Sequence, residues 1–194
     1  MRKDYEIILK LIPENSKVLD IGCSDGELIS YLENKGVSAQ GVELNQEKVI
    51  KCLEKGLDVI HGDINLIVED FPFNQFDYCL LTQTIQAVQK PDQLLNTLKK
   101  VSKNIIVSFN NSARLSKISN FLLSGSFDSL LKKADSDHWY NTDYIHPCSI
   151  KDFKKLAANL NLKIISTFDV INQRKFENGK IPSNLFCKEV LFHI

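Results

Sequence analysis

Three acidic residues with the potential to bind a ligand, Asp20, Glu43 and Asp63, lie at or near the ends of short apolar runs. Asp20 belongs to the stretch VLDIGCSDGEL, in which Gly22 and Gly26 follow it closely. Glycines spaced in this way after a strand are typical of a turn at which a ligand approaches the backbone. An acid about twenty residues further on, such as Glu43, can accept hydrogen bonds from both hydroxyls of a ribose. The pattern therefore indicates a nucleoside or nucleotide site.

The glycine turn favours a nucleoside without phosphates. It reads Asp20-x-Gly22-x-Ser24-x-Gly26, so the GxGxxG fingerprint of dinucleotide sites is absent and no pyrophosphate cradle is evident. A dinucleotide-dependent oxidoreductase is accordingly the least favoured of the possible functions. Asp63, in HGDI, places a further carboxylate where it could accept a hydrogen bond from the exocyclic amine of adenine. The alternative for Asp63 is a helix N-cap or a turn residue.

Strands and helices alternate through the first part of the chain and would position these residues. Apolar runs too short for helices alternate with segments that repeat apolar residues at helical spacing. Repeated strand and helix units imply a parallel sheet with right-handed crossovers. The expected strands are 18–21, 37–44, 57–64, 76–83 and 104–111, and the expected helices are 5–12, 26–34, 46–55 and 91–101.

The alternation lapses after residue 111. A helical insertion, or lid, is expected at about 112–147, with a helix that ends at Gly125, a second helical piece around 127–134, and the aromatic loop DSDHWYNTDYIHP. Ser149 and Asp152 resemble a capping box before another helix. The runs LKIISTFDVI and SNLFCKEVLFHI follow without a helix between them, which predicts an antiparallel pair at the sheet edge. We therefore expect a doubly wound α/β fold with a mostly parallel, seven-stranded sheet.

Composition narrows the possible classes of protein. Lys plus Arg and Asp plus Glu number 24 each, so no excess of positive charge points to nucleic acid. No apolar stretch approaches the length of a membrane span, and charged residues interrupt the N-terminal segment. The five cysteines are far apart and include no CxxC, which argues against disulfides and a zinc site. We expect one cytoplasmic domain over 1–194, with no metal and no contact with membrane or nucleic acid.

The ordered motifs VLDIGCSDGEL, GVEL, HGDI and FDYCLLTQTIQAV resemble those of the class I S-adenosylmethionine-dependent methyltransferases, a superfamily with a Rossmann-like fold. Within that superfamily the chain is similar to the MetW family of methionine biosynthesis over nearly its full length. This resemblance rests on RKDYEIILKLIPENSKVLDIGCSDGELISYL, TQTIQAVQKPDQLL, IIVSFNN and HWYNTDYIHPCSIKDF. The last two segments are the more specific, because general methyltransferases vary there.

The resemblance implies S-adenosylmethionine as the cofactor and gives each matching residue a role. Asp20, directly or through water, and the backbone carbonyl of Thr82 would support the methionyl ammonium. Glu43 would hold the ribose. The remaining contacts would come from the backbone of Gly22, Cys23 and Gly26 to the methionyl group, and from Leu44, Asp63 and Ile64 to the adenine.

The resemblance leaves two functions open. The first is methyl transfer to a small molecule, for which proximity supplies most of the acceleration and a base is optional. Candidates for such a base are His146, Tyr140 and His138, in the loop expected to cover the site. The second is a regulatory partner of homoserine O-acyltransferase that senses S-adenosylmethionine or S-adenosylhomocysteine. Gln86, where many small-molecule methyltransferases carry His, somewhat favours the second function.

Overall fold

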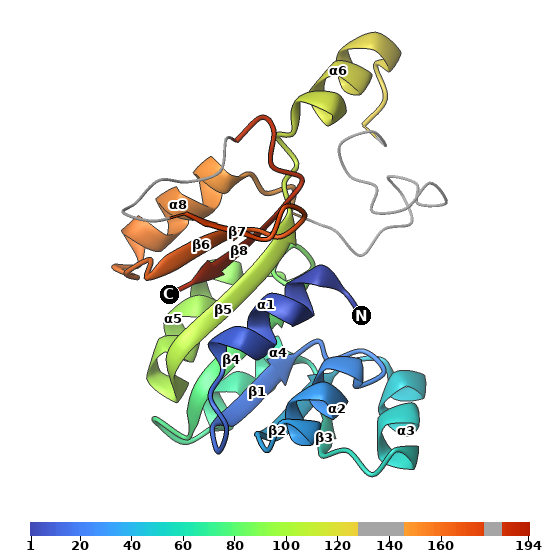
Figure 1. Ribbon diagram of the computed structural model, residues 1–194, viewed down its shortest axis with the longest axis vertical. Helices are drawn as coiled ribbons and strands as arrows, with labels where there is room; N and C mark the ends of the chain where they lie inside the picture. Colours follow the sequence, from blue (N-terminus) through green and yellow to red (C-terminus); the bar gives the residue numbers. More distant parts are fainter. Residues whose placement is uncertain (128–145, 177–183) are drawn as a thin grey trace.

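The computed structural model describes residues 1–127, 146–176 and 184–194. In this part of the chain eight strands form a single sheet in the order β3-β2-β1-β4-β5-β8-β6-β7 (Figure 1). The strands β1 to β5 pair in parallel, whereas β8 is antiparallel to β5 and β6, and β7 is antiparallel to β6. The strands are β1 (Lys17–Ile21), β2 (Ser38–Glu43), β3 (Val59–His61), β4 (Phe76–Thr82), β5 (Ser102–Asn110), β6 (Ser166–Asp169), β7 (Arg174–Phe176) and β8 (Glu189–His193).

Helices cover both faces of this sheet. One apolar cluster joins α1, α2 and α3 to one face, and a second joins α4, η1, α5 and α8 to the other. Successive strand residues alternate between the two, since Val18 and Leu80 belong to the first cluster and Leu19 and Leu81 to the second. The helices are α1 (Lys3–Leu11), α2 (Glu27–Asn34), α3 (Gln46–Glu54), α4 (Ile64–Ile67), the 3-10 helix η1 (Val68–Asp70), α5 (Pro91–Val101), α6 (Leu115–Ser124) and α8 (Ile150–Asn159).

The doubly wound, mostly parallel sheet with an antiparallel C-terminal pair is confirmed. The sequence predicts seven strands, and the described residues contain one more, β7. This strand has three residues, Arg174–Phe176, of which two are exposed. Because so short a polar segment shows no apolar alternation, its pairing with β6 at the edge depends on tertiary context.

The first helix predicted within the insertion and the helix predicted after it are both confirmed. Gly125, with φ +65°, follows α6 in the left-handed conformation, which is favourable for glycine. Ser149 and Asp152 form the predicted capping box before α8. The ten residues of α6 are all described and none of them is buried, and in Figure 1 this helix projects from the body of the sheet. Most of the second predicted helical piece and of the aromatic loop lies outside the described residues.

The strand order places β1 next to both β2 and β4. In the register, Asp20 of β1 lies opposite Gly41 of β2 and Leu80 of β4. The chain therefore runs from β1 outward to β2 and β3 on one side, and then crosses to β4 and β5 on the other side of β1. Ligands of open α/β sheets bind at such a switch point, outside the carboxyl ends of the strands.

Candidate functional site

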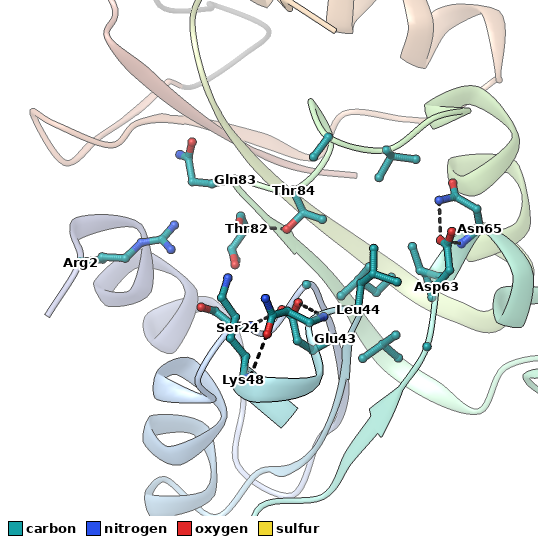
Figure 2. A pocket seen from close by; sticks show the side chains of 18 residues that line it. Arg2, Ser24, Glu43, Leu44, Lys48, Asp63, Asn65, Thr82, Gln83 and Thr84 are labelled. Atoms are coloured by element: carbon teal, nitrogen blue, oxygen red, sulfur yellow. Dashed lines mark hydrogen bonds between the residues drawn. The ribbon is translucent and has the colours of Figure 1, made fainter. Parts of the chain in front are cut away.

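A cleft of about 650 Å³ lies at the carboxyl ends of β1, β2, β3 and β4, at this switch point (Figure 2). Its walls come from the four strand ends and from the N-terminus of α1. The lining residues are Arg2, Ile21, Gly22, Ser24, Val42, Glu43, Leu44, Asn45, Lys48, Gly62, Asp63, Ile64, Asn65, Thr82, Gln83, Thr84, Ala87 and Val88. Six residues predicted from the sequence are therefore brought together here: Gly22, Glu43, Leu44, Asp63, Ile64 and Thr82.

Four N–H groups of the glycine turn after β1 form hydrogen bonds within the protein. The N–H groups of Gly22 and Cys23 both donate to the carbonyl of Val42, at 2.8 and 3.2 Å. The N–H of Ser24 donates to Glu43, and that of Gly26 donates to the carbonyl of Cys23 at 3.0 Å. A phosphate at such a turn is normally bound by free backbone N–H groups. Because these four donors are occupied, the turn offers close approach to its backbone rather than an anion cradle.

Glu43, the last residue of β2, is 8% exposed and is held from both sides. Its Oε2 accepts from the Ser24 N–H at 2.8 Å, and its Oε1 accepts from the Asn45 N–H at 2.9 Å. A carboxylate has about four acceptor positions, so each oxygen keeps one for a ligand. The carboxylate is thus oriented before any ligand arrives and can accept from two adjacent hydroxyls.

Asp63 and Leu44 line the neighbouring part of the cleft. Asp63 is the N-cap of α4, as the alternative interpretation of the sequence allows, and its Oδ1 accepts from the backbone and side-chain nitrogens of Asn65 at 2.9 and 2.6 Å. No residue in the described ranges donates to its Oδ2 in a hydrogen bond of the structure. Leu44 is 65% exposed although it is apolar, whereas Ile64 is buried. This part of the cleft can bind a flat apolar ring with a donor at its edge.

Asp20 lies beneath the cleft with a buried and unsatisfied carboxylate. It is 1% exposed, and its Oδ1 has no hydrogen-bond partner among the described residues. Burial raises the pKa of Asp20 to about 7; the charge of Arg2 lowers it, and those of Asp4 and Glu43 raise it further. A buried acceptor without a hydrogen bond lowers stability, so a cationic or N–H donor near this oxygen would be favourable. An ammonium group in the cleft would supply one.

A strained corner follows β4 at residues 82–84. Gln83 has φ +61°, which is unfavourable for a residue with a side chain, and its N–H donates to the carbonyl of Ser108 at 2.9 Å. The Thr84 hydroxyl donates to the Thr82 carbonyl at 3.2 Å. The same hydroxyl would lie 2.7 Å from a Cβ at position 22, so only glycine fits there. The turns after β1 and β4 therefore pack directly against each other.

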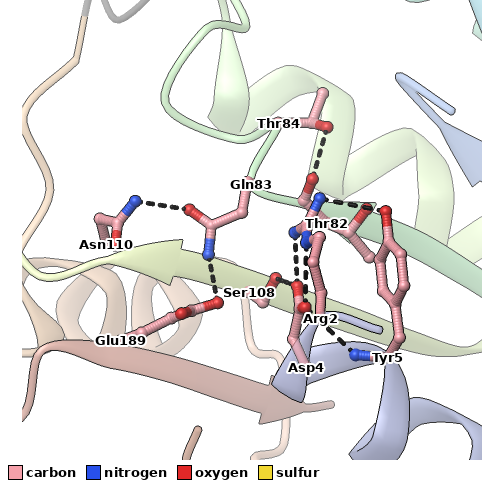
Figure 3. A network of polar contacts seen from close by, with 9 residues as sticks. All are labelled: Arg2, Asp4, Tyr5, Thr82, Gln83, Thr84, Ser108, Asn110 and Glu189. Carbon is pink, nitrogen blue, oxygen red and sulfur yellow. Dashed lines mark hydrogen bonds and ion pairs between the residues drawn. The ribbon is translucent and has the colours of Figure 1, made fainter. Parts of the chain in front are cut away.

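The side chain of Gln83 links this corner to β5 and β8 (Figure 3). It donates to Glu189 Oε1 at 2.6 Å and accepts from Asn110 Nδ2 at 2.9 Å. Burial raises the pKa of Glu189 to about 7, a shift that Asp4 increases and that Arg2 and Gln83 oppose. Polar groups from the start of β8 are therefore tied to the wall of the cleft.

Three predicted cofactor contacts do not line the cleft. Asp20 lies beneath it, as described above, and Cys23 packs over Gly41, where an added Cβ would lie 2.6 Å from its Sγ. Gly26 is the N-cap of α2, with φ +76°, and packs against Leu57. For Cys23 and Gly26 the structure thus provides a packing reason, and their contact with a cofactor stays a prediction.

The catalytic candidates are described only in part. His146 is exposed and does not line the cleft; its Nε2 forms a 3.1 Å hydrogen bond with the carbonyl of Gln89. His138 and Tyr140 lie outside the described residues. Gln86 is 1% exposed, and its amide nitrogen is 3.4 Å from Ser112 Oγ and 3.5 Å from the His146 carbonyl oxygen. A proton-accepting role for His146, Tyr140 and His138 stays a prediction.

Sequence reasoning assigned no site role to several lining residues. Asn45 and Lys48 follow Glu43 and could have been found from their position after a strand end. Arg2 carries no such signal, because it precedes the first helix and reaches the cleft only through the packing of α1. In the described residues no cluster of His, Cys, Asp or Glu is placed to hold a metal ion, and no helix could span a membrane.

Comparison with protein families identifies the chain. The family model described as methionine biosynthesis protein MetW matches residues 2–194. The chain belongs to the MetW family. A curated relative, the bifunctional methionine biosynthesis protein MetXA/MetW of Rhodopirellula baltica, is 31% identical over 98% of this chain. The match covers 32% of that relative, so the chain spans about a third of its length.

Solved structures show the same fold. A SAM-dependent methyltransferase from Methanosarcina mazei aligns with a TM-score of 0.71 and 16% identity, covering 96% of this chain and 95% of that one. The [4+2]-cyclase SpnF aligns with a TM-score of 0.64 and 16% identity, covering 88% of this chain and 60% of that one. This MetW-family chain therefore has the methyltransferase fold, but a fold shared with a cyclase does not by itself define the reaction.

Proposed function

We propose that this chain binds S-adenosylmethionine in the cleft and transfers its methyl group to a small acceptor in methionine biosynthesis. One observation carries the proposal: the carboxylates of Glu43 and Asp63, from successive strand ends, share one cleft with the exposed apolar side chain of Leu44. Together these groups match a ribose, an adenine amine and an adenine face. The occupied N–H groups of the glycine turn further support a ligand without phosphates.

The nucleoside half of the ligand would be recognised by oriented groups. Glu43, already fixed by Ser24 and Asn45, accepts from the two ribose hydroxyls. Asp63 Oδ2 accepts a hydrogen bond from the adenine amine, because Oδ1 already accepts from Asn65. Leu44 covers one face of the base and loses its exposure to water on binding. Prior orientation of these groups lowers the entropy cost of binding.

The amino-acid half would lie against the turns after β1 and β4. Its ammonium interacts with the buried Asp20, directly or through a water, and donates to the carbonyl of Thr82. Gly22 allows the chain of the ligand to pass close to the backbone, since no side chain stands there. The unsatisfied Asp20 oxygen supports the fit between these residues and the cofactor.

The cofactor supplies a methyl group that is activated by its attachment to a sulfonium. The task of the protein is to hold an acceptor in line with that methyl and to exclude water, which can account for most of the acceleration. Where the acceptor must lose a proton, His146, Tyr140 and His138 are the proposed acceptors of that proton.

Calorimetric titration tests the binding half of the proposal. Titration with S-adenosylmethionine and with S-adenosylhomocysteine is expected to give one saturable site for each. A matched variant, Glu47→Ala, removes an exposed acid from α3 outside the cleft and should bind as the wild type does. Absence of saturable binding of both ligands would rule out this function.

A second function is favoured by the curated relative. That protein, named MetXA/MetW, joins two activities in one chain, and this chain matches only a third of it. We propose as the alternative that the chain is a regulatory partner of homoserine O-acyltransferase and reports the level of S-adenosylmethionine or S-adenosylhomocysteine. The presence of Gln86 in place of a histidine adds support.

Co-purification separates the two functions. The regulatory function predicts a complex with homoserine O-acyltransferase and an acyltransferase rate that depends on the ligand added. Glu43→Ala should abolish the ligand effect and leave the complex intact. Isolation of the two proteins as separate species, with an unchanged acyltransferase rate, would contradict the regulatory function.

A further inference from the structure

The carboxylate of the proposed ligand still needs a partner. The methionyl group carries an ammonium and a carboxylate on the same carbon, so their binding groups must be neighbours. A buried carboxylate requires a cation or several N–H donors, and the N–H groups of Gly22, Cys23, Ser24 and Gly26 are already occupied. A cationic side chain is therefore the partner best suited to it.

Among the described residues, the cationic side chains that line the cleft are Arg2 and Lys48. In Figures 2 and 3 the guanidinium of Arg2 points toward Thr82, which is one of the proposed ammonium sites. The charge of Arg2 also acts on Asp20, the other ammonium site, and lowers its pKa against the larger effect of burial. Arg2 thus lies next to the proposed ammonium sites, as a partner for the carboxylate on the same carbon should.

Arg2, the residue before α1, is held by two residues of that helix. Its Nε and Nη2 donate to the two oxygens of Asp4 at 3.1 and 2.6 Å, and its Nη1 donates to the Tyr5 hydroxyl at 3.1 Å. Asp4 is itself 1% exposed and accepts from the Ser108 hydroxyl of β5 at 3.0 Å. The guanidinium is therefore anchored to the centre of the sheet, although its own side chain is 39% exposed.

The anchoring leaves two donors for a ligand. A guanidinium has five N–H groups, and the described residues accept three of them from Arg2. One N–H on Nη1 and one on Nη2 remain, a pair that can bind both oxygens of a carboxylate. Lys48 is exposed and offers a flexible point charge. An oriented fork loses less conformational entropy on binding than a free ammonium group does.

We infer that Arg2, positioned by Asp4 and Ser108, binds the α-carboxylate of the methionyl group, an assignment that rests on the proposed function. The site would then discriminate between ligands that carry the amino-acid carboxylate and analogues that lack it. Asp4 and Ser108 act as positioning residues, because they reach the ligand only through Arg2.

Decarboxylated S-adenosylmethionine provides the matched probe, because it keeps the adenosine, the sulfonium and the amine. The wild type should bind S-adenosylmethionine about 10- to 100-fold more tightly than this analogue, the range expected for a charged, paired hydrogen bond. In Arg2→Gln the preference should fall to within about threefold. Arg2→Gln keeps a donor for Asp4, and Arg2→Lys, which keeps the charge without the fork, should be intermediate.

Lys3→Gln serves as the control, since it removes the neighbouring cation, which binds the carbonyl of Ile171 and does not line the cleft. Equal affinity of the wild type for both ligands would overturn the inference without any variant. It would also be overturned if Arg2→Gln kept the full preference, or if Lys48→Gln removed it. Binding of neither ligand to the wild type would instead defeat the proposed function.

Discussion

The backbone N–H of Ser24 donates to Oε2 of Glu43 at 2.8 Å, across nineteen residues of sequence. Ser24 adopts φ +55°, so the turn after β1 places this N–H toward the end of β2. The bond joins the glycine turn to the acid proposed to hold the ribose. It also explains why a serine is acceptable in this turn, since its backbone performs the contact and its side chain is not required.

Replacement of Glu43 by alanine should weaken the binding of S-adenosylhomocysteine by about 2 to 4 kcal/mol, because two charged hydrogen bonds to the ribose are lost. This corresponds to roughly 30- to 1,000-fold in Kd, measured by calorimetry. Glu47→Ala removes the same charge from the exposed first turn of α3 and should change the affinity by less than about threefold. An equal effect of both variants would mean that only net charge matters.

The folded state should lose stability as the pH rises, owing to Asp20. Burial raises its folded pKa to about 7 from an ordinary 3.8, with Arg2 opposing and Asp4 and Glu43 reinforcing the shift. Between these values the folded state binds more protons than the unfolded state, so the free energy of unfolding falls from pH 4 to pH 7. The rise of the pKa from 3.8 to about 7 corresponds to roughly 4 kcal/mol of stability. The free energy of unfolding, measured with urea, should fall less between pH 5.5 and pH 8 in Asp20→Asn than in the wild type.

Ligand binding should lower the pKa of Asp20 again. An ammonium near the carboxylate favours its ionised form, so S-adenosylhomocysteine should bind more tightly as the pH rises through 7, with release of a proton. Calorimetry near pH 7 in buffers of different ionisation enthalpy measures that proton. Asp20→Asn should release fewer protons. A wild type whose affinity and proton count are both independent of pH would show that Asp20 does not meet the ammonium.

Much of this fold could be predicted because its parallel strands and covering helices carry strong periodic patterns. Helix α5, for example, has the predicted bounds Pro91–Val101, with proline at its first residue. In contrast, α4 and η1 together are too short to show a helical period. The Arg2–Asp4 pair was not predicted, because the Ser108 that anchors it lies 104 residues away from Asp4. Contacts of this kind depend on which segments the completed sheet brings together.

Leu44 should contribute to binding without contributing to stability. Its side chain is 65% exposed, so Leu44→Ala should change the free energy of unfolding by less than about 0.5 kcal/mol. Covering Leu44 with adenine removes apolar surface from water. Leu44→Ala should therefore weaken the binding of S-adenosylhomocysteine by about 1 to 2 kcal/mol. Leu53→Ala is the matched control, since Leu53 is 56% exposed on α3 and does not line the cleft. A similar loss of affinity in both would contradict the contact with adenine.

Substitution of Gly26 can show whether this glycine is needed for packing or for contact with the ligand. An added Cβ would lie 2.3 Å from Leu57 Cδ1 and 3.0 Å from Cys52 Sγ, in a backbone with φ +76°. Gly36 has a similar φ of +80°, but a Cβ there would have no described atom within 4 Å. Gly36→Ala should therefore show only the backbone cost of about 1 kcal/mol.

Gly26→Ala should add a packing penalty and lose about 2 to 4 kcal/mol of unfolding free energy in urea. If Gly26 serves packing alone, the folded fraction of Gly26→Ala will bind S-adenosylhomocysteine as the wild type does. A loss of affinity in that variant, with none in Gly36→Ala, would instead support the predicted approach of the Gly26 backbone to the methionyl group. Equal stability of the two variants would show that Leu57 and Cys52 yield to the added methyl group, because the two positions differ chiefly in these neighbours.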